Sequence, residues 1–313
     1  MKHIFLTLLT IVLLPFIVLP QTISLKETVE LTNNASDGFY FPKFSPDGSK
    51  IFFTKENYKG IYFYDAGNKS IKMLNDEDGA GYEFNVNSQD NLVYYRSDRY
   101  INGKKYSTLK SLEITTGTIK NIVSDKRGLS TPRYIGTNKI AFTVQNNLML
   151  ISGNKIIKKT GITSIDKPFA LIENCKIALY VGGKKKILAP VGNGNYIWPS
   201  VSPDNTKLLF TLAGKGTFVT DLNGNIISKL GYANYPQWSP DGKWISYMVD
   251  KDDGNAVTSS DVYIASWDGE KIFQITDSKN NRVMYPEWSP AGNQIVVNTY
   301  DGKIQLLTLN FKM

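Results

Sequence analysis

Two residue types that most enzymes use for catalysis are almost missing from this chain of 313 residues. It contains one histidine, His3, and one cysteine, Cys175. A Ser-His-Asp triad, a Cys-His pair and a histidine zinc site all need histidine in the folded protein, and His3 lies in a segment that we expect to be removed. One cysteine also excludes an internal disulfide, and we expect Cys175 to be a buried, unreactive thiol.

The acidic clusters are the remaining candidates for metal chemistry. Residues 250–255 and 76–79 are rich in Asp and Gly and resemble calcium loops at first sight. An EF-hand loop needs ligands at positions 1, 3 and 5, Gly at 6 and a bidentate Glu at 12, and neither cluster has that spacing. The sequence therefore predicts no metal and no cofactor. Carboxylates paired from distant segments would leave no spacing signal, so a glycan-cleaving pair stays open.

The N-terminal segment has the features of a secretory signal. A short basic start is followed by 17 uncharged residues, from Ile4 to Pro20, which is slightly short for a membrane span. We predict a signal peptide over residues 1–24, a folded domain over 25–313, and export to the periplasm or cell surface. The alternative is that the signal is not cleaved. The uncleaved segment would then be the one membrane attachment that we expect.

The charge of the chain argues against nucleic acid as a partner. The formal net charge is +8, but Lys is scattered along the chain and only five basic residues are Arg. A nucleic-acid reader would show clustered Arg and Lys with interleaved aromatics. The basic surface leaves an acidic glycan as a conceivable partner.

A repeated hairpin positions whatever chemistry remains. An aromatic or apolar residue is followed by Ser-Pro-Asp-Gly and then by a second apolar run, which predicts a tight β-hairpin, because Pro fixes φ, Asp bonds the local backbone and Gly accepts positive φ. The turn residues are Ser45, Pro46, Asp47, Gly48, Ser202, Pro203, Asp204, Ser239, Pro240, Asp241, Gly242, Ser289, Pro290 and Gly292.

The spacing of the repeat predicts an all-β fold, a single β-propeller. Seven equivalent positions follow one another at a mean spacing near 41 residues, close to the ~40–45 residues of a propeller blade. We predict seven blades, or six if the two middle repeats merge, with an irregular fourth blade at residues 164–190. A spare strand at residues 28–32 should complete the last blade, at residues 285–309, and close the ring. The anchors are Pro42, Asn85, Pro132, Phe169, Pro199, Pro236 and Pro286.

These hairpins resemble the repeat of TolB-type β-propellers, also called WD40-like or PD40 repeats. The resemblance covers residues 25–313 and implies a six- or seven-bladed propeller in an exported or envelope protein. TolB has an additional N-terminal domain that we do not expect here, since the first hairpin begins near Phe39. The repeat also occurs in prolyl-oligopeptidase-type peptidases and in oligogalacturonate lyases. We expect no hydrolase domain after Leu309, and the histidine ligands expected of such a lyase are missing.

The candidate binding residues lie on the face opposite the Ser-Pro-Asp-Gly turns. The longest insertions there are residues 96–106 and 250–260, and Tyr and Arg are enriched at binding hot spots. We expect Phe44, Trp238 and Trp288 to pack between blades, whereas Trp198 could face the central channel. The predicted site residues are Tyr82, Arg96, Asp98, Arg99, Tyr100, Tyr232, Asn234, Tyr235, Arg282 and Tyr285.

These features together predict a non-catalytic propeller that binds a protein or peptide partner on the loop-rich face. The alternatives are a glycan-binding or glycan-degrading propeller and an accessory propeller of a separate hydrolase. A channel lined by Tyr, Trp and paired carboxylates would favour a glycan. An apolar rim with Arg and Tyr around a plain pore would favour a protein.

Overall fold

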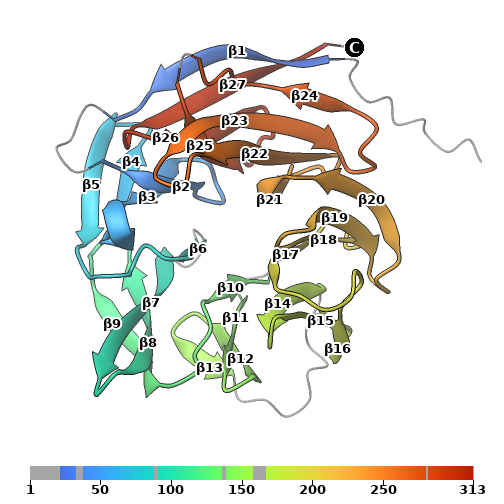
Figure 1. The fold of residues 1–313 in the computed structure, drawn as a ribbon. Helices are drawn as coiled ribbons and strands as arrows, with labels where there is room; N and C mark the ends of the chain where they lie inside the picture. Colours follow the sequence, from blue (N-terminus) through green and yellow to red (C-terminus); the bar gives the residue numbers. More distant parts are fainter. Residues whose placement is uncertain are drawn as a thin grey trace, which may run out of the picture.

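The chain forms seven β-sheets arranged as blades around a central axis, as predicted (Figure 1). The structure is a computed structural model that describes residues 22–32, 38–87, 91–135, 139–157, 167–279 and 281–312. Residues 1–21, which hold most of the predicted signal peptide, lie outside the described residues. No helix within the described ranges is long and apolar enough to cross a membrane.

Each blade runs from an inner strand at the channel to an outer strand at the rim, and neighbouring strands are antiparallel. The first four sheets are formed by β2 (Tyr40–Phe44), β3 (Lys50–Thr54), β4 (Ile61–Asp65) and β5 (Ser70–Asn75); β6 (Asn85–Asn87), β7 (Leu92–Ile101), β8 (Lys104–Glu113) and β9 (Ile119–Lys126); β10 (Arg133–Tyr134), β11 (Lys139–Val144), β12 (Asn147–Ser152) and β13 (Lys155–Ile157); and β14 (Phe169–Glu173), β15 (Lys176–Val181) and β16 (Lys184–Leu188). The last three are formed by β17 (Tyr196–Val201), β18 (Lys207–Leu212), β19 (Gly216–Asp221) and β20 (Ile226–Gly231); β21 (Asn234–Trp238), β22 (Trp244–Asp252), β23 (Val257–Ser266) and β24 (Ile272–Gln274); and β25 (Val283–Trp288), β26 (Gln294–Thr299), β27 (Ile304–Lys312) and β1 (Thr22–Glu30). A short 3-10 turn, η1 (Glu56–Tyr58), joins β3 to β4.

The fourth blade is irregular, as its short interval predicts. It has three strands, β14 to β16, and the chain passes from Leu188 directly to the inner strand β17 of the next blade. Cys175 lies at the turn between β14 and β15 with a φ of 59° and is exposed, so the prediction of a buried thiol is wrong. The hairpin is tight enough to place Asn174 and Cys175 in the turn itself, outside the strands.

The N-terminal strand closes the ring, but over different residues from those predicted. β1 pairs antiparallel with β27 from Thr22 opposite Lys312 to Glu30 opposite Gln305, so the closing strand begins earlier than residue 28. Ile23 is buried in the core between the last two blades. Thr32 then extends the contact, since its Oγ1 accepts a 2.9 Å hydrogen bond from the backbone N of Ile304.

The repeated turns form as their sequence predicts. In the first blade Ser45 Oγ donates to Asp47 Oδ1 at 2.5 Å and accepts from the backbone N of Lys50 at 3.0 Å, while the N of Gly48 donates to the Ser45 carbonyl. Ser202 and Ser239 repeat these contacts with Asp204 and Asp241. The same hydrogen bonds thus tie each turn to the start of its second strand.

The turns of neighbouring blades also contact one another on this face. A Cβ placed on Gly242 would lie 3.3 Å from Cδ of Pro203 in the preceding blade, and Gly242 has a φ of 69°. A Cβ placed on Gly48 would likewise contact Pro290, and one placed on Gly292 would contact Pro240. These turn residues are therefore structural: they fix the hairpins and pack the blades together.

Gly242→Val should destabilise the protein. A β-branched side chain resists positive φ, and its Cβ would also press on Pro203. We expect a loss of roughly 1–3 kcal/mol, because backbone strain at such a position costs that much. Urea unfolding measures the loss, and Lys243→Val, at the next residue, whose side chain is 40% exposed, is the control. An unchanged unfolding midpoint for Gly242→Val would contradict this account of the turn.

Large side chains fill the spaces between blades. Phe44 packs with residues of the first and last blades, and Trp288 packs with residues of the last two. Trp238 is partly buried against the core between the fifth and sixth blades. All three predicted inter-blade aromatics are confirmed, and the blades form one continuous packed ring around the channel.

Candidate functional site at the channel mouth

A distortion of the inner strands points aromatic side chains at the channel. The β ladder is irregular between Tyr40 and Lys43, and it shifts at the corresponding places in β17, β21 and β25. At each shift one bulky residue has positive φ, which is rare for such residues. A bulge redirects a side chain in this way, and bulges are frequent beside binding sites. The redirected residues, each followed by proline, are Phe41 (53°), Trp198 (51°), Tyr235 (52°) and Tyr285 (55°).

These aromatics form a continuous arc along the mouth of the channel. The ring of Phe41 lies 4.2 Å from that of Tyr285, Tyr285 lies 5.3 Å from Tyr235, and Tyr235 lies 6.1 Å from Trp198. At the other end Phe41 stacks on Tyr58 of η1 at 4.6 Å, and Tyr58 meets Tyr82 edge-on at 5.0 Å. We call these six residues the aromatic arc. Its rings come from four blades and the connections after β3 and β5.

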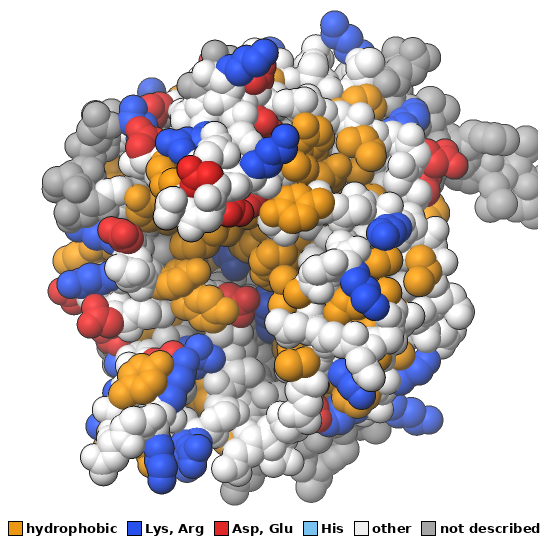
Figure 2. All heavy atoms as spheres, viewed as in Figure 1, with side chains coloured by type: hydrophobic (Ala, Val, Ile, Leu, Met, Phe, Trp, Pro, Cys, Tyr) orange, Lys and Arg blue, Asp and Glu red, His pale blue; other side chains and the backbone are white. Residues whose placement is uncertain are grey.

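The arc surrounds a cavity of about 330 Å³. Figure 2 shows a hollow near the middle of this face, with hydrophobic side chains around it and charged side chains inside. The volume lies within the ~300–1,000 Å³ of small-ligand pockets, which are largely aromatic with a few polar groups. The wall below the arc includes Lys43, Glu83, Arg133, Ser200, Gln237 and Glu287.

Lys43 and Glu287 are opposite charges that face the same cavity. Lys43 Nζ donates to the carbonyl of Phe84 at 3.2 Å. Among the described residues no hydrogen bond or ion pair holds the Glu287 carboxylate; it interacts with Lys43 only across a longer distance. Burial lowers the pKa of Lys43 against the attraction of Glu287, and burial raises the pKa of Glu287 against that of Lys43. The floor therefore carries an acid and a base that are not bonded to each other.

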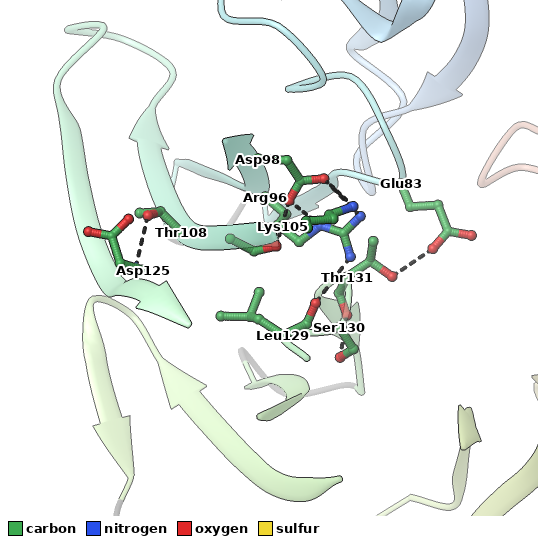
Figure 3. Close-up of polar contacts among 10 residues, drawn as sticks. Glu83, Arg96, Asp98, Lys105, Thr108, Asp125, Leu129, Ser130 and Thr131 are labelled. Carbon is green, nitrogen blue, oxygen red and sulfur yellow. Dashed lines mark hydrogen bonds and ion pairs between the residues drawn. The ribbon is translucent and has the colours of Figure 1, made fainter. Parts of the chain in front are cut away.

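Glu83 and Arg133 form a second charged pair on the cavity wall. Arg133 Nη2 lies 3.3 Å from Glu83 Oε1, and Thr131 Oγ1 donates to Glu83 Oε2 at 2.6 Å (Figure 3). Burial opposes ionisation of Glu83, but the Arg133 guanidinium and the Thr131 hydroxyl hold its pKa below the usual value. Glu83 is therefore a fixed carboxylate, in contrast with Glu287.

The predicted site residues separate into three groups. Tyr82, Tyr235 and Tyr285 belong to the aromatic arc. Burial raises the pKa of Tyr235 and of Tyr285, so both keep their phenolic protons. The other predicted residues do not line the cavity. Four of them lie on the β7–β8 hairpin, where Arg96 stands 5.8 Å from the ring of Tyr82, and the other three, Tyr232, Asn234 and Arg282, lie at or just before the inner strands β21 and β25.

Residues 96–106 are strand and not the loop insertion that we predicted. β7 and β8 stay paired from Leu92 opposite Glu113 to Ile101 opposite Lys104, so the insertion is a long hairpin with a two-residue turn. Residues 250–260 likewise lengthen the hairpin of β22 and β23. At the far end of each hairpin both faces are exposed to solvent, so the sequence there no longer alternates between polar and apolar residues. For this reason these strands resemble a loop in sequence.

Arg96 is committed to the fold. Its Nη1 donates to the carbonyl of Leu129 at 3.1 Å, and its Nε lies 3.1 Å from Asp98 Oδ1 (Figure 3). Asp98 also pairs with Lys105 at 2.6 Å and accepts from Ser107 at 2.6 Å. Burial opposes the ionised form of Asp98, yet these donors lower its pKa. This cluster braces the hairpin and leaves Arg96 with little freedom to contact a partner.

Charge reversal should therefore act differently at two neighbouring arginines. Arg96→Glu puts a carboxylate beside Asp98 in a half-buried cluster, and we expect a loss of roughly 2–4 kcal/mol in unfolding free energy. Arg99→Glu breaks the ion pair with Asp125. Because the side chains of Arg99 and Asp125 are 60% and 44% exposed, the loss in unfolding free energy should be under about 1 kcal/mol. Urea unfolding of both variants provides the comparison. Equal losses in unfolding free energy would mean that the Arg96 side chain contributes no more to the stability of the fold than the Arg99 side chain does.

The remaining predicted residues make contacts of their own. Asn234 Nδ2 donates to Asp250 Oδ1 at 2.8 Å and to the Tyr232 hydroxyl at 2.9 Å. Arg282 lies 3.9 Å above the ring of Tyr300 and donates to the carbonyl of Val257. Tyr100 is 71% exposed near the end of the β7–β8 hairpin.

Sequence reasoning missed most of the cavity wall. Trp198, Tyr235 and Tyr285 were predicted at the channel or its mouth, but Phe41, which precedes the shared proline as they do, was not, and neither were residues after the proline such as Lys43 and Glu287. Position within the repeat was the signal that could have found them. One anchor also needs correction. Asn85 pairs with Tyr94 as Lys43 pairs with Phe52, so the counterpart of Pro42 is Phe84 and not Asn85.

The comparisons with known proteins identify the fold. A solved structure of TolB from Acinetobacter baumannii matches 82% of this chain with 17% identity and a TM-score of 0.52, and the chain spans 58% of its length. A chain of the Mitotic Checkpoint Complex matches over 98% of both chains with 12% identity and a TM-score of 0.59. The chain is a TolB-like, WD40-like propeller in fold. No protein-family model matches the chain, and no curated protein is similar to it in sequence.

Proposed function

We propose that this protein is an exported propeller that binds a glycan at the aromatic arc without cleaving it. The observation that supports this is the combination of Tyr, Trp and two glutamates in one cavity, which is the arrangement that favours a glycan over a protein. Flat aromatic rings contact the C–H faces of sugars, and charged groups below them bond to hydroxyls. The mature chain has no histidine to act as a general base or metal ligand.

Truncating the arc should remove binding and leave the fold intact. Trp198 and Tyr285 are only half-buried, so Trp198→Ala and Tyr285→Ala remove ligand surface more than core. We expect each to weaken glycan binding by roughly 10-fold or more, as truncation of a central aromatic does at interfaces. Binding to a glycan array measures the loss, and analysis of the incubated glycans tests for cleavage. Cleavage that disappears in Glu83→Gln or Glu287→Gln would make the protein an enzyme.

A protein or peptide partner is the second candidate. It is favoured by the exposed end of the β7–β8 hairpin, where Tyr100 and Arg99 stand free of the core. Tyr and Arg are common interface anchors. Tyr100→Ala is therefore the matched control: it should leave glycan binding unchanged, whereas loss of a crosslinked envelope protein in this variant would support the protein partner. An accessory role beside a separate hydrolase is compatible with either ligand.

A further inference from the structure

The floor of the channel places an anion and a cation in one cavity without joining them. Lys43 and Glu287 occupy the same position of the first and last blades, directly after the shared proline. Their side chains are partly shielded from solvent, and a buried charge is costly unless it is paired or hydrogen-bonded. Lys43 has one backbone acceptor, and Glu287 has no donor among the described residues. A ligand that supplies both contacts would relieve this cost.

Two further polar side chains, those of Ser200 and Gln237, border the same space. Ser200 comes directly after the shared proline in the fifth blade and lines the cavity, and its buried Oγ has no hydrogen-bond partner in the described part of the chain. Gln237, at the same position of the sixth blade, adds an amide that can both donate and accept. The wall thus offers a strong acceptor, a strong donor and two groups that can act as either.

The charges on the wall balance. Lys43 and Arg133 are cations, and Glu83 and Glu287 are anions. A carboxylate on the ligand would lie near the anions Glu83 and Glu287, and a cation would lie near Lys43 and Arg133, so either ligand would face like charges as well as opposite ones. A neutral ligand avoids both costs. Hydroxyl groups suit this wall because each can donate to Glu287 and accept from Lys43.

We propose that the cavity binds a neutral sugar unit, with the aromatic arc against one face of the ring and adjacent hydroxyls bridging Glu287 and Lys43. The inference rests on the proposed glycan binding and specifies its ligand: hexose or N-acetylhexosamine units, not uronic acids. Glu287 and Lys43 are the residues that set this preference. The positive φ of Phe41, Trp198, Tyr235 and Tyr285 holds their rings over the floor, so the site is formed before the ligand arrives.

The test compares neutral and acidic oligosaccharides on one protein. Labelled protein is applied to an array of neutral hexose and N-acetylhexosamine oligomers and of uronic-acid oligomers, and the strongest binder is measured by isothermal titration. We expect neutral oligomers to bind and uronic-acid oligomers to bind at least ~10-fold more weakly, because carboxylates would face Glu287. Preferential binding of uronic acids that the arc variants abolish would overturn the neutral-sugar inference and keep the proposed function.

Three variants locate the interaction. Glu287→Gln and Lys43→Met should each reduce affinity for the best neutral oligomer by ~10-fold or more, since each removes a charge-assisted hydrogen bond. Ser200→Ala changes no charge and should reduce affinity less, so it tests the site even if the charge variants fold poorly. Lys243→Met, on the turn face with a side chain that is 40% exposed, is the control. Affinity that survives all three cavity variants would overturn the inference, and affinity that also survives the arc variants would overturn the proposed function.

Discussion

Deleting β1 should lower the melting temperature more than any single substitution in the ring. The deletion removes a full antiparallel ladder with β27 and leaves that strand as an open edge. It also removes Ile23 from the core between the last two blades and the Lys303–Glu30 ion pair of 3.2 Å. In a ring of blades that contact only their neighbours, an incomplete last blade weakens both of its interfaces.

The side chains of β1 separate the effect of the ladder from that of the core. Ile23 is 3% exposed, and Ile23→Ala should cost about 2–5 kcal/mol as a buried truncation. Val29 is 40% exposed, and Val29→Ala should change the unfolding free energy by under about 0.5 kcal/mol. Calorimetry of the deletion and both variants tests this order. A deletion no worse than Ile23→Ala would show that the ladder itself does little to close the ring.

The sequence predicted the ring better than its closure. The Ser-Pro-Asp-Gly turns follow from local chemistry, so hairpins and blade number could be predicted from spacing alone. The closing strand depends on a partner 275 to 290 residues away in the sequence, and along β1 only Ile23 is buried. The predicted strand at residues 28–32 overlaps β1 only at residues 28–30, because the first residues of β1, 22–24, had been assigned to the signal peptide.

The candidate site was predicted at its rim and missed at its floor. Tyr82, Tyr235 and Tyr285 were identified because Tyr is common in binding surfaces. Lys43 and Glu287 come from opposite ends of the chain, and only ring closure brings them to one cavity. No spacing rule detects such a pair. Arg96 misled the prediction because its hydrogen bond to the carbonyl of Leu129, 33 residues away, is a tertiary contact that the sequence does not reveal.

Reversing one floor charge should destabilise the protein, and reversing both should restore part of the loss. Glu287→Lys would place a second ammonium opposite Lys43 and near Arg133 in a cavity that now holds balanced charge. We expect a loss of roughly 2–4 kcal/mol, somewhat below the cost of breaking a fully buried pair because the channel admits water. The double variant Lys43→Glu with Glu287→Lys restores opposite charges, so its loss should be smaller than the sum of the single losses.

The exposed pair of Arg99 and Asp125, 2.8 Å apart, provides the matched cycle. Its coupling should be under about 1 kcal/mol and should fall with added salt, as for surface ion pairs. The coupling of Lys43 with Glu287 should be larger and less sensitive to salt, because the cavity wall shields both groups. Urea unfolding at two salt concentrations measures both cycles. Additive losses at Lys43 and Glu287 would show that the two charges act independently, and a single ligand hydroxyl pair would then have no reason to bridge them.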